Sequence, residues 1–499
     1  MTVAHAHLAP VELDDPTDAG PADAGAPSGR LPAWVRRHAG WVAGASAVLM
    51  LTLVGVQSSL DERERERLAY LADVPGVLSP LHDPPAALRT WTPSAGALVA
   101  QDPTGHWAIG ARYHLGGVDL RGTDPDTGDV LWSVPFSLDA ALPPGGRSEF
   151  PSVWVRCTTT TSPDGPRAVC AAEVSPARAD GAVTPLLVLD PASGRTLATP
   201  SLEAGALWSA TGSYLVVARP HRDAAGAVRW VLSATDPATG ALRWQRRTPW
   251  VPEVHEVRFG DQVIRSQSDL TSDDDRVLLT DSGHAWLFSA DGEPRGDVTV
   301  QTDGWAELAR SGALVWTPWQ TFAVPAGVLV TRDGTRVAVG ERPARLAVDD
   351  GSARDVVLLS ERSARGEAPQ DGTLVGRDAT SGAELWRLTG TTGEPLLVDG
   401  VVHVAQGDGV RAVDARTGES RWLAHVGAPP VYLGTDGSLV VVVTADRTLR
   451  GFDRADGQLA SVADVARHLA RDPGGVDQVS EYAGRLLVRF RDGTGIVVG

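Results

Sequence analysis

Lysine is absent from this chain of 499 residues, so arginine supplies all 45 of its basic side chains. A chain without lysine cannot hold a P-loop lysine, a lysine Schiff base with pyridoxal phosphate or a kinase-type phosphate-binding lysine. Only two cysteines are present, which excludes cysteine-rich zinc and iron–sulfur sites and the haem attachment motif. The 62 acidic side chains bring the net charge to −17, and this charge argues against nucleic acid as a partner.

The N-terminal part of the chain has the composition of a tail followed by a membrane anchor. Residues 1–38 contain few apolar side chains and more acids than bases, so we expect a disordered acidic tail. The next 18 residues, AGWVAGASAVLMLTLVGV, carry no charge and would span most of a ~30 Å hydrocarbon core as a helix. We predict a transmembrane helix at residues 39–57 that contacts the lipid bilayer as an uncleaved signal anchor. A cleaved signal peptide would have a shorter leading segment, and a buried core helix would show a polar face.

The charges on either side of this run suggest its orientation. Arg36 and Arg37 directly precede it, whereas the three arginines that follow it alternate with acids. We therefore predict a cytoplasmic N-terminus and an extracytoplasmic C-terminal part, in a single-pass protein of the cell membrane. Residues 58–76 are expected to form a solvated helical stalk that Pro75 and Gly76 end. A coiled-coil stalk is the alternative, but the apolar heptads that it needs are missing.

From about residue 75 onward one motif recurs. It consists of Asp, two variable residues, Thr, Ser or Asp, then Gly, and in its fullest form a Trp four residues after the Gly. The clear copies contain Asp124, Gly128 and Trp132; Asp190 and Gly194; Asp236, Gly240 and Trp244; Asp378, Gly382 and Trp386; Asp414, Gly418 and Trp422; and Asp453 and Gly457. Weaker copies surround Gly292 and Gly334. A repeat of about 40 to 50 residues is typical of propellers and solenoids.

Each residue of the motif has a physical reason to recur. The Asp suits the first position of a turn, where its side chain accepts hydrogen bonds from the following amides. The Gly suits the left-handed position that closes a bulged hairpin. The Trp falls on the next strand, and we expect its ring to wedge between neighbouring units and to cover the next one.

These motifs resemble the repeat of the pyrroloquinoline-quinone-type (PQQ-like) β-propeller family. The resemblance implies an all-β propeller of four-stranded blades at residues 77–499, with eight blades predicted and seven as the alternative. Eight marker glycines and one blade made from both chain ends amount to nine units, so we expect one weak copy to be irregular. The early strand ALRTW, residues 87–91, resembles ALRW at 241–244. We predict that it completes the last blade and joins the two ends of the ring.

Cys157 and Cys170 flank a stretch that reads as two paired strands with a turn at Asp164 and Gly165. Opposed cysteines in such a hairpin could form a disulfide in an oxidising compartment, and two small buried thiols are the alternative.

The sequence shows few candidates for catalysis or metal binding. His255 and Glu256 do not continue into a zincin motif. Asp269, Asp273, Asp274 and Asp275 form an acidic loop without the internal glycine that a calcium loop needs, so a solvated loop is the favoured interpretation.

Two classes of function follow from the resemblance. A quinoprotein (PQQ-dependent) dehydrogenase would be expected to add adjacent cysteines and a calcium-bound quinone, and this sequence has no adjacent cysteines. We therefore predict no catalytic, cofactor-binding or metal-binding residue. The favoured function is a membrane-tethered binding or scaffold module at the cell envelope, with an unidentified protein, peptide or saccharide as partner at the propeller face. A sensor is a third hypothesis, but the N-terminal tail holds no recognisable output domain.

Overall fold

The computed structural model describes residues 33–81, 87–91, 97–102, 105–114, 117–137, 152–162, 164–175, 183–252, 256–259, 262–265, 268–273, 275–299, 304–309, 311–318, 327–361, 372–467, 469 and 471–499. The chain divides into two compact bodies, Met1–Glu66 and Arg67–Gly499. The predicted tail lies outside the described residues up to residue 32, and residues 33–38 already belong to helix α1 (Ala33–Ala72).

The predicted membrane span lies on α1. Among the described residues, those of α1 included, no helix is both long and apolar enough to cross a membrane. The side chains of residues 39, 40 and 42–47 of the predicted span lie outside that description.

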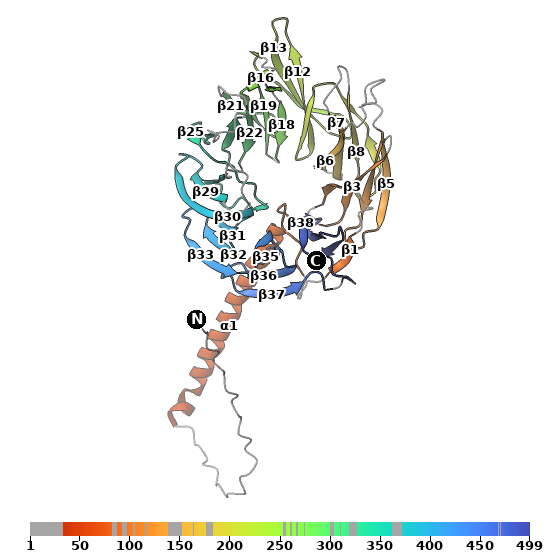
Figure 1. Cartoon of the computed structure of the whole chain (residues 1–499). Helices are drawn as coiled ribbons and strands as arrows, with labels where there is room; N and C mark the ends of the chain where they lie inside the picture. Colours follow the sequence, from red (N-terminus) through yellow and green to blue (C-terminus); the bar gives the residue numbers. More distant parts are fainter. Residues whose placement is uncertain are drawn as a thin grey trace, which may run out of the picture. The chain divides into compact units, whose positions relative to one another are not determined.

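The second body consists of antiparallel sheets arranged around a ring (Figure 1), as expected for a β-propeller. Blade 1 contains β2–β5 at Ala97–Gln101, Ala108–His114, Gly117–Thr123 and Val130–Ser137. Blade 2 contains β6–β10 at Ser152–Ser162, Gly165–Ser175, Thr184–Leu189, Thr196–Ala198 and Ser201–Leu202. Blade 3 contains β11–β15 at Leu207–Thr211, Tyr214–Arg222, Ala227–Thr235, Leu242–Arg247 and Val251–Pro252. Blade 4 contains β18–β21 at Asp269–Ser272, Arg276–Asp281, His284–Ser289 and Pro294–Thr299.

The remaining blades follow in chain order. Blade 5 contains β22–β25 at Gly304–Leu308, Leu314–Pro318, Gly327–Val330 and Arg336–Val339. Blades 6 and 7 share one sheet with β26–β33 at Arg342–Pro343, Val348–Asp349, Val356–Glu361, Gly372–Asp378, Glu384–Val398, Val401–Gln406, Gly409–Asp414 and Ser420–His425. Blade 8 contains β34–β37 at Pro430–Thr435, Leu439–Thr444, Thr448–Asp453 and Leu459–Asp464. Blade 9 contains β38–β40 at Val476–Tyr482, Arg485–Phe490 and Gly495–Val498, together with β1 at Ala87–Trp91. A separate hairpin of β16 (Glu256–Phe259) and β17 (Gln262–Arg265) follows blade 3.

The described strands thus form nine blades, where eight were predicted. The weak motif copies at Gly292 and Gly334 were expected to leave one blade irregular, but each lies in a complete four-stranded sheet. The eight-stranded sheet is two blades, because β29 pairs with the first half of β30 and β31 pairs with its second half. The marker turn connects the third and fourth strands of blades 1–8, and blade 9 has chain ends in its place.

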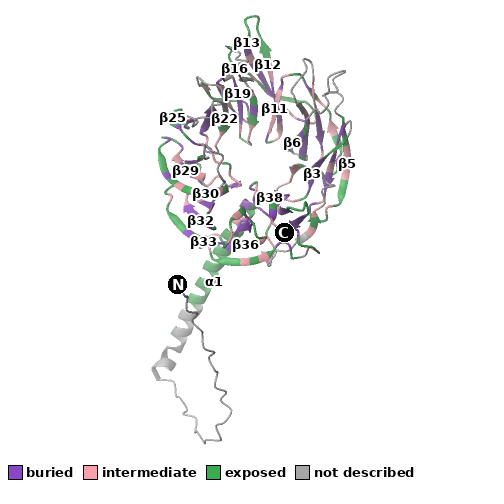
Figure 2. Ribbon diagram, in the orientation of Figure 1, coloured by how far each residue is buried: buried purple, intermediate pink, exposed green. Residues whose placement is uncertain are grey.

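The two ends of the ring meet in blade 9, as predicted. Strand β1 pairs antiparallel with β40, with Arg89 opposite Val497 and Trp91 opposite Gly495. The C-terminal part supplies three strands to this blade, one more than expected, and β1 is its fourth and outermost strand. The inner strands of the blades are mostly buried, and the outer strands and turns are more exposed (Figure 2).

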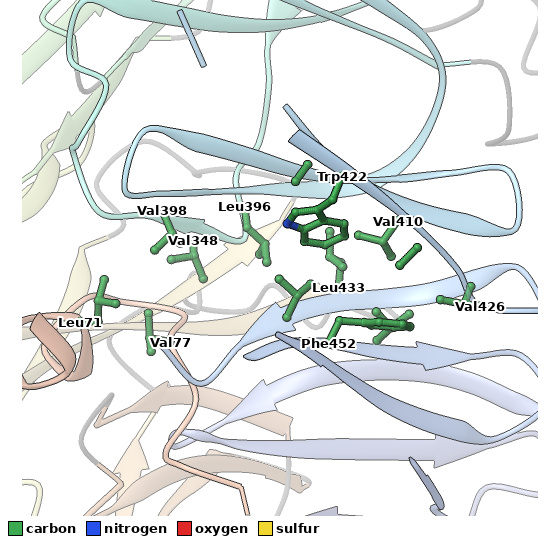
Figure 3. Packing of buried hydrophobic residues seen from close by; sticks show 14 of the residues in the cluster. Leu71, Val77, Val348, Leu396, Val398, Val410, Trp422, Val426, Leu433 and Phe452 are labelled. Atoms are coloured by element: carbon green, nitrogen blue, oxygen red, sulfur yellow. The ribbon is translucent and has the colours of Figure 1, made fainter. Parts of the chain in front are cut away.

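The end of α1 belongs to the core of the second body and is not a solvated stalk. Leu71, Val74 and Val77 are 1%, 5% and 2% exposed and pack with residues of blades 7 and 8. Figure 3 shows Leu71 and Val77 in this cluster, which also contains Trp422. The Leu78 amide donates to the Thr435 carbonyl at 2.8 Å. Leu71 and Val74, which the sequence alone placed on a solvated stalk, therefore pack against the ring.

The chain enters the ring on one identifiable face. Strands alternate in direction, so the turn between strands one and two and the marker turn lie on the same face, which we call the motif face. The Arg67 guanidinium donates to the Gly437 carbonyl, in the first turn of blade 8, at 3.2 Å. The Ser79 amide donates to the Gly484 carbonyl, in the first turn of blade 9, at 2.6 Å. Residues 67–79 therefore cross the motif face.

The closing blade gives the first testable prediction. The Arg89 side chain donates from Nε to the Pro125 carbonyl of blade 1 at 3.1 Å, and a hydrogen bond from a charged donor contributes about 1.5–3 kcal/mol. We expect Arg89→Ala to lower the free energy of unfolding by this amount and to speed hydrogen exchange in β40. Arg112→Ala, at an exposed position of β3, is the control. Unchanged exchange in β40 would show that Arg89 does not hold the ring closed.

Candidate functional site

The marker turns have one shared backbone geometry. In the six clear copies the Gly amide donates to the carbonyl of the motif Asp at 2.8 Å, and the Asp side chain accepts from amides that follow it. All eight marker glycines have positive φ, between 69° and 89°. Hydrogen bonds from the amide and hydroxyl of Ser381 hold the pKa of Asp378 below its usual value. Each clear copy therefore combines an Asp side chain that caps the following amides with a Gly in the left-handed conformation.

Four tryptophans each bridge to the next blade. The indole N–H of Trp132 donates to the Pro191 carbonyl at 2.9 Å, and a Cβ on Gly194 would lie 2.5 Å from the indole ring. The same arrangement joins Trp244 to Ala290 and Gly292, Trp386 to Ala415 and Gly418, and Trp422 to Arg454 and Gly457. The third strand provides room for these rings, since Gly or Ala lies opposite each Trp: Gly122, Ala234, Gly376 and Ala412.

Other residues take the tryptophan position in the remaining blades. The position is identified by its pairing with the third strand. It holds Ala198 in blade 2, Gly296 in blade 4, Val337 in blade 5 and Ser461 in blade 8. In blade 9 it is Arg89, whose guanidinium lies against Gly128, so Trp91 is not the equivalent that the ALRTW match suggested. Trp91 instead packs edge-on against Tyr482 at 5.0 Å between ring centroids.

Two marker glycines have no described side chain over them. Val337 covers Gly382 at 2.5 Å, but Gly240 and Gly334 would have nothing within 4 Å of a Cβ. Both follow a blade whose tryptophan position holds a small residue, Ala198 or Gly296. At the first of these joints Arg167 of blade 2 instead forms a salt bridge with Asp236 at 2.8 Å.

The predicted cysteine pair lies in blade 2. Cys157 on β6 and Cys170 on β7 are directly opposite in the register and form a disulfide. Cys170 is fully buried at the joint between blades 1 and 2. The disulfide therefore crosslinks the first two strands of this blade.

The acidic loop acts as a turn. Asp273 accepts hydrogen bonds from the amides of Asp275 and Arg276 and pairs with the Arg276 guanidinium. His255 and Asp274 lie outside the described residues, and Glu256 begins β16. Among the described residues no three His, Cys, Asp or Glu side chains come together as a metal site would require.

A cavity of about 460 Å³ opens on the motif face. Its lining residues come from the entering chain and from blades 5, 6, 7 and 9. They are Pro75, Gly76, Glu307, Leu308, Ala309, Ser311, Pro343, Ala344, Leu346, Ala347, Asp349, Gly351, Ala353, Arg354, Val356, Leu358, Leu397 and Glu481. The wall combines apolar side chains with several polar and charged groups, and its volume lies in the range of ligand sites.

The cavity combines distant parts of the sequence. Gly76 lies so close to the wall that a Cβ would be 2.1 Å from the Ala347 carbonyl oxygen. Burial raises the pKa of the Glu481 carboxyl, and the Gly484 amide donates a long hydrogen bond to it. Sequence reasoning missed this site, because no repeat or motif marks its lining residues.

The fold and its repeats define the second body as a β-propeller. Residues 370–483 match the family model described as "Outer membrane protein assembly factor BamB". This stretch contains the turns of Gly382, Gly418 and Gly457, so its repeats are of the PQQ-like kind. No curated protein matches the chain.

Solved propellers are similar at low identity. BamB from Moraxella catarrhalis is 16% identical, with 83% of this chain and 99% of that chain covered and a TM-score of 0.39. The computationally designed Ika8 protein is 15% identical, with coverages of 85% and 99% and a TM-score of 0.37. A eukaryotic initiation factor is 10% identical, with coverages of 78% and 90% and a TM-score of 0.43. At these values the likenesses carry no argument about function.

The indole bridges give the second prediction. We expect Trp422→Ala to lower the free energy of unfolding by about 3–5 kcal/mol, because it removes a large buried ring and one interblade hydrogen bond. Chemical denaturation would measure the loss. Trp154→Ala, whose side chain is 41% exposed, should cost far less. Equal losses in the two variants would contradict the bridging role.

A buried histidine gives the third prediction. His403 on β31 is fully buried beside Trp422, neither ring nitrogen has a partner among the described residues, and burial lowers its pKa to about 3. The unfolded chain takes up this proton near pH 6.5, so the folded state loses stability as the pH falls from there toward 3, by about 1.4 kcal/mol per pH unit. We expect His403→Leu to flatten that pH dependence in denaturation curves. His221→Leu, at an exposed site, should not, and equal slopes for the two variants would refute the assignment.

Proposed function

We propose that this chain is a non-catalytic β-propeller, tethered to the cell membrane, that binds a partner in the cell envelope and holds it at the motif face. The observation that carries the proposal is the cavity of about 460 Å³ beside Pro75 and Gly76. Its wall is built from residues of four blades and of the entering chain, and Gly76 of the entering chain packs directly against Ala347. A segment of another protein, with apolar side chains and a positively charged end, fits a wall that combines apolar side chains with the carboxyl groups of Glu307, Asp349 and Glu481.

The family match supports a role in assembly. Residues 370–483, which match the model described as an outer membrane protein assembly factor, include the lining residues Leu397 and Glu481. We propose on this ground that the chain assists other envelope proteins rather than converting a small substrate.

The N-terminal helix supports tethering. Residues 39–57 carry no charged side chain, and Trp41, Leu51 and Val54 of this segment are 83%, 72% and 62% exposed. Apolar side chains exposed on a helix are stable in contact with lipid. We propose that this segment lies in the cytoplasmic membrane, with the N-terminus inside and the propeller outside.

Photo-crosslinking tests where the partner binds. A photoreactive amino acid at Arg354, an exposed lining residue, should form one discrete adduct in cells. The same amino acid at Ala225, in the exposed second turn of blade 3 on the opposite face, should not. Ala344→Phe, which narrows the cavity, should reduce the adduct at position 354 at least several-fold while the protein stays folded. Equal adducts at both positions would refute the proposed site.

A cofactor titration tests the non-catalytic part of the proposal. The full chain in detergent is titrated with PQQ and calcium, and quinone absorbance and dye reduction with alcohols and sugars are followed. We expect neither stoichiometric binding nor substrate-dependent dye reduction. Tight binding together with dye reduction would establish a quinoprotein dehydrogenase instead.

A further inference from the structure

Residues 67–79, which we call the docking segment, contain the end of helix α1 and the chain that leads from it into the ring. Pro75 and Gly76 in this segment belong to the wall of the cavity. Leu71, Val74 and Val77 on either side of them are buried against blades 7 and 8. Any pull on the helix therefore passes through a piece of chain that is also part of the cavity wall.

The docking segment covers a second part of the wall, strand β27 (Val348–Asp349). This strand pairs in parallel with β30 through only two residues, with Val348 opposite Leu396. Leu71 and Val77 pack in one cluster with Val348, which is 1% exposed (Figure 3). A parallel pair of two residues supplies little stability of its own. This part of the wall therefore depends on the docking segment.

The polar contacts of the docking segment are few. The Tyr70 hydroxyl donates to the Asp350 carbonyl, next to the cavity wall, at 2.7 Å. The Arg67 guanidinium forms an ion pair with Asp399 at 2.7 Å, and both side chains are partly exposed, so this pair contributes little. The segment adds no strand to any blade. Its contacts can therefore break while the blades stay intact.

We propose that the docking segment is a releasable wall of the cavity: a pull on α1 detaches it, opens the cavity and frees the bound partner. The release of a partner rests on the proposed function, whereas the opening itself does not. Detachment exposes Leu71, Val74 and Val77 to water, which is unfavourable without a pull. The cavity therefore stays closed in an unloaded chain.

Thiol labelling measures the opening without any ligand. Both native cysteines form a disulfide, so Val348→Cys places the only free thiol under the docking segment. Leu71→Ala weakens docking, and we expect it to speed the reaction of this thiol with a maleimide at least tenfold in the full chain in detergent. Leu270→Ala is the matched control, because Leu270 is also 1% exposed but lies in the core of blades 3 and 4. Equal rates in these two variants would overturn the proposal.

A milder substitution repeats the test without a loss of core volume. Tyr70→Phe keeps the ring and removes only the hydrogen bond to the Asp350 carbonyl, so labelling of Val348→Cys should become roughly fivefold faster. Tyr214→Phe is its control, since that hydroxyl accepts from Arg243 within blade 3. An unchanged rate in Tyr70→Phe would contradict the proposed wall.

A pulling experiment tests the effect of load. Magnetic tweezers hold the full chain through Ser58→Cys on α1 and Ala225→Cys in the second turn of blade 3, both exposed positions. We expect a first extension of at most ~70 Å before any blade unfolds, because residues 67–86 add at most ~3.5 Å each when extended. Leu71→Ala should lower the force of this step, and Leu270→Ala should not. Unfolding of the blades with no earlier step would overturn the proposal.

The crosslink at Arg354 separates this inference from the proposed function. Leu71→Ala should reduce the adduct at position 354 at least several-fold, and Leu270→Ala should leave it unchanged. An absent adduct in the otherwise unaltered chain would refute the proposed function and leave the labelling and pulling results to decide the opening. An adduct that forms but does not respond to Leu71→Ala would refute the release of the partner.

Discussion

The ring depends most on one contact, which recurs at four joints: an indole of one blade packs against a glycine of the next. The contact combines a large apolar area with one oriented hydrogen bond, as at Trp386 and Gly418. It requires three positions at once: the ring itself, a small residue opposite it and a left-handed glycine in the next blade. Four of the nine blades give such a contact to the next blade, and at these joints the same geometry holds the adjacent blades together. Where the indole is missing, other side chains take over, such as Arg167 on Asp236.

Much of this fold could be read from the sequence, because its main signal is local. Asp414, Gly418 and Trp422 lie within nine residues, and the turn chemistry of that stretch alone predicts the hairpin and its bulge. The pairing of β1 with β40 was also predictable, since a propeller leaves its last blade to be completed by the other chain end. The predicted blade count was wrong because departures from the motif were taken to indicate an irregular blade. Gly292 and Gly334 sit in turns one residue shorter, and the sheets around them are nevertheless complete.

The features that sequence reasoning missed all depend on contacts between distant residues. Arg89 occupies the tryptophan position of blade 9, but only the register of β1 against Val497 shows this. Leu71 and Val74 were placed on a solvated stalk, since no residue near them in the sequence indicates the blades that cover them. The cavity joins Gly76 with Glu481, and no local pattern links two residues so far apart. Local chemistry therefore predicted the blades, and the site arises from how they close around the entering chain.

The course of the chain across the motif face has a mechanical consequence. A pulling force on the helix would reach Leu71, Val74 and Val77 before β1, because these residues come first in the chain. Their side chains pack against blades 7 and 8. The seam between β1 and β40, which no covalent turn secures, is thereby shielded from the load. If the helix tethers the ring as proposed, a pulling force is therefore spread over a hydrophobic contact away from this seam.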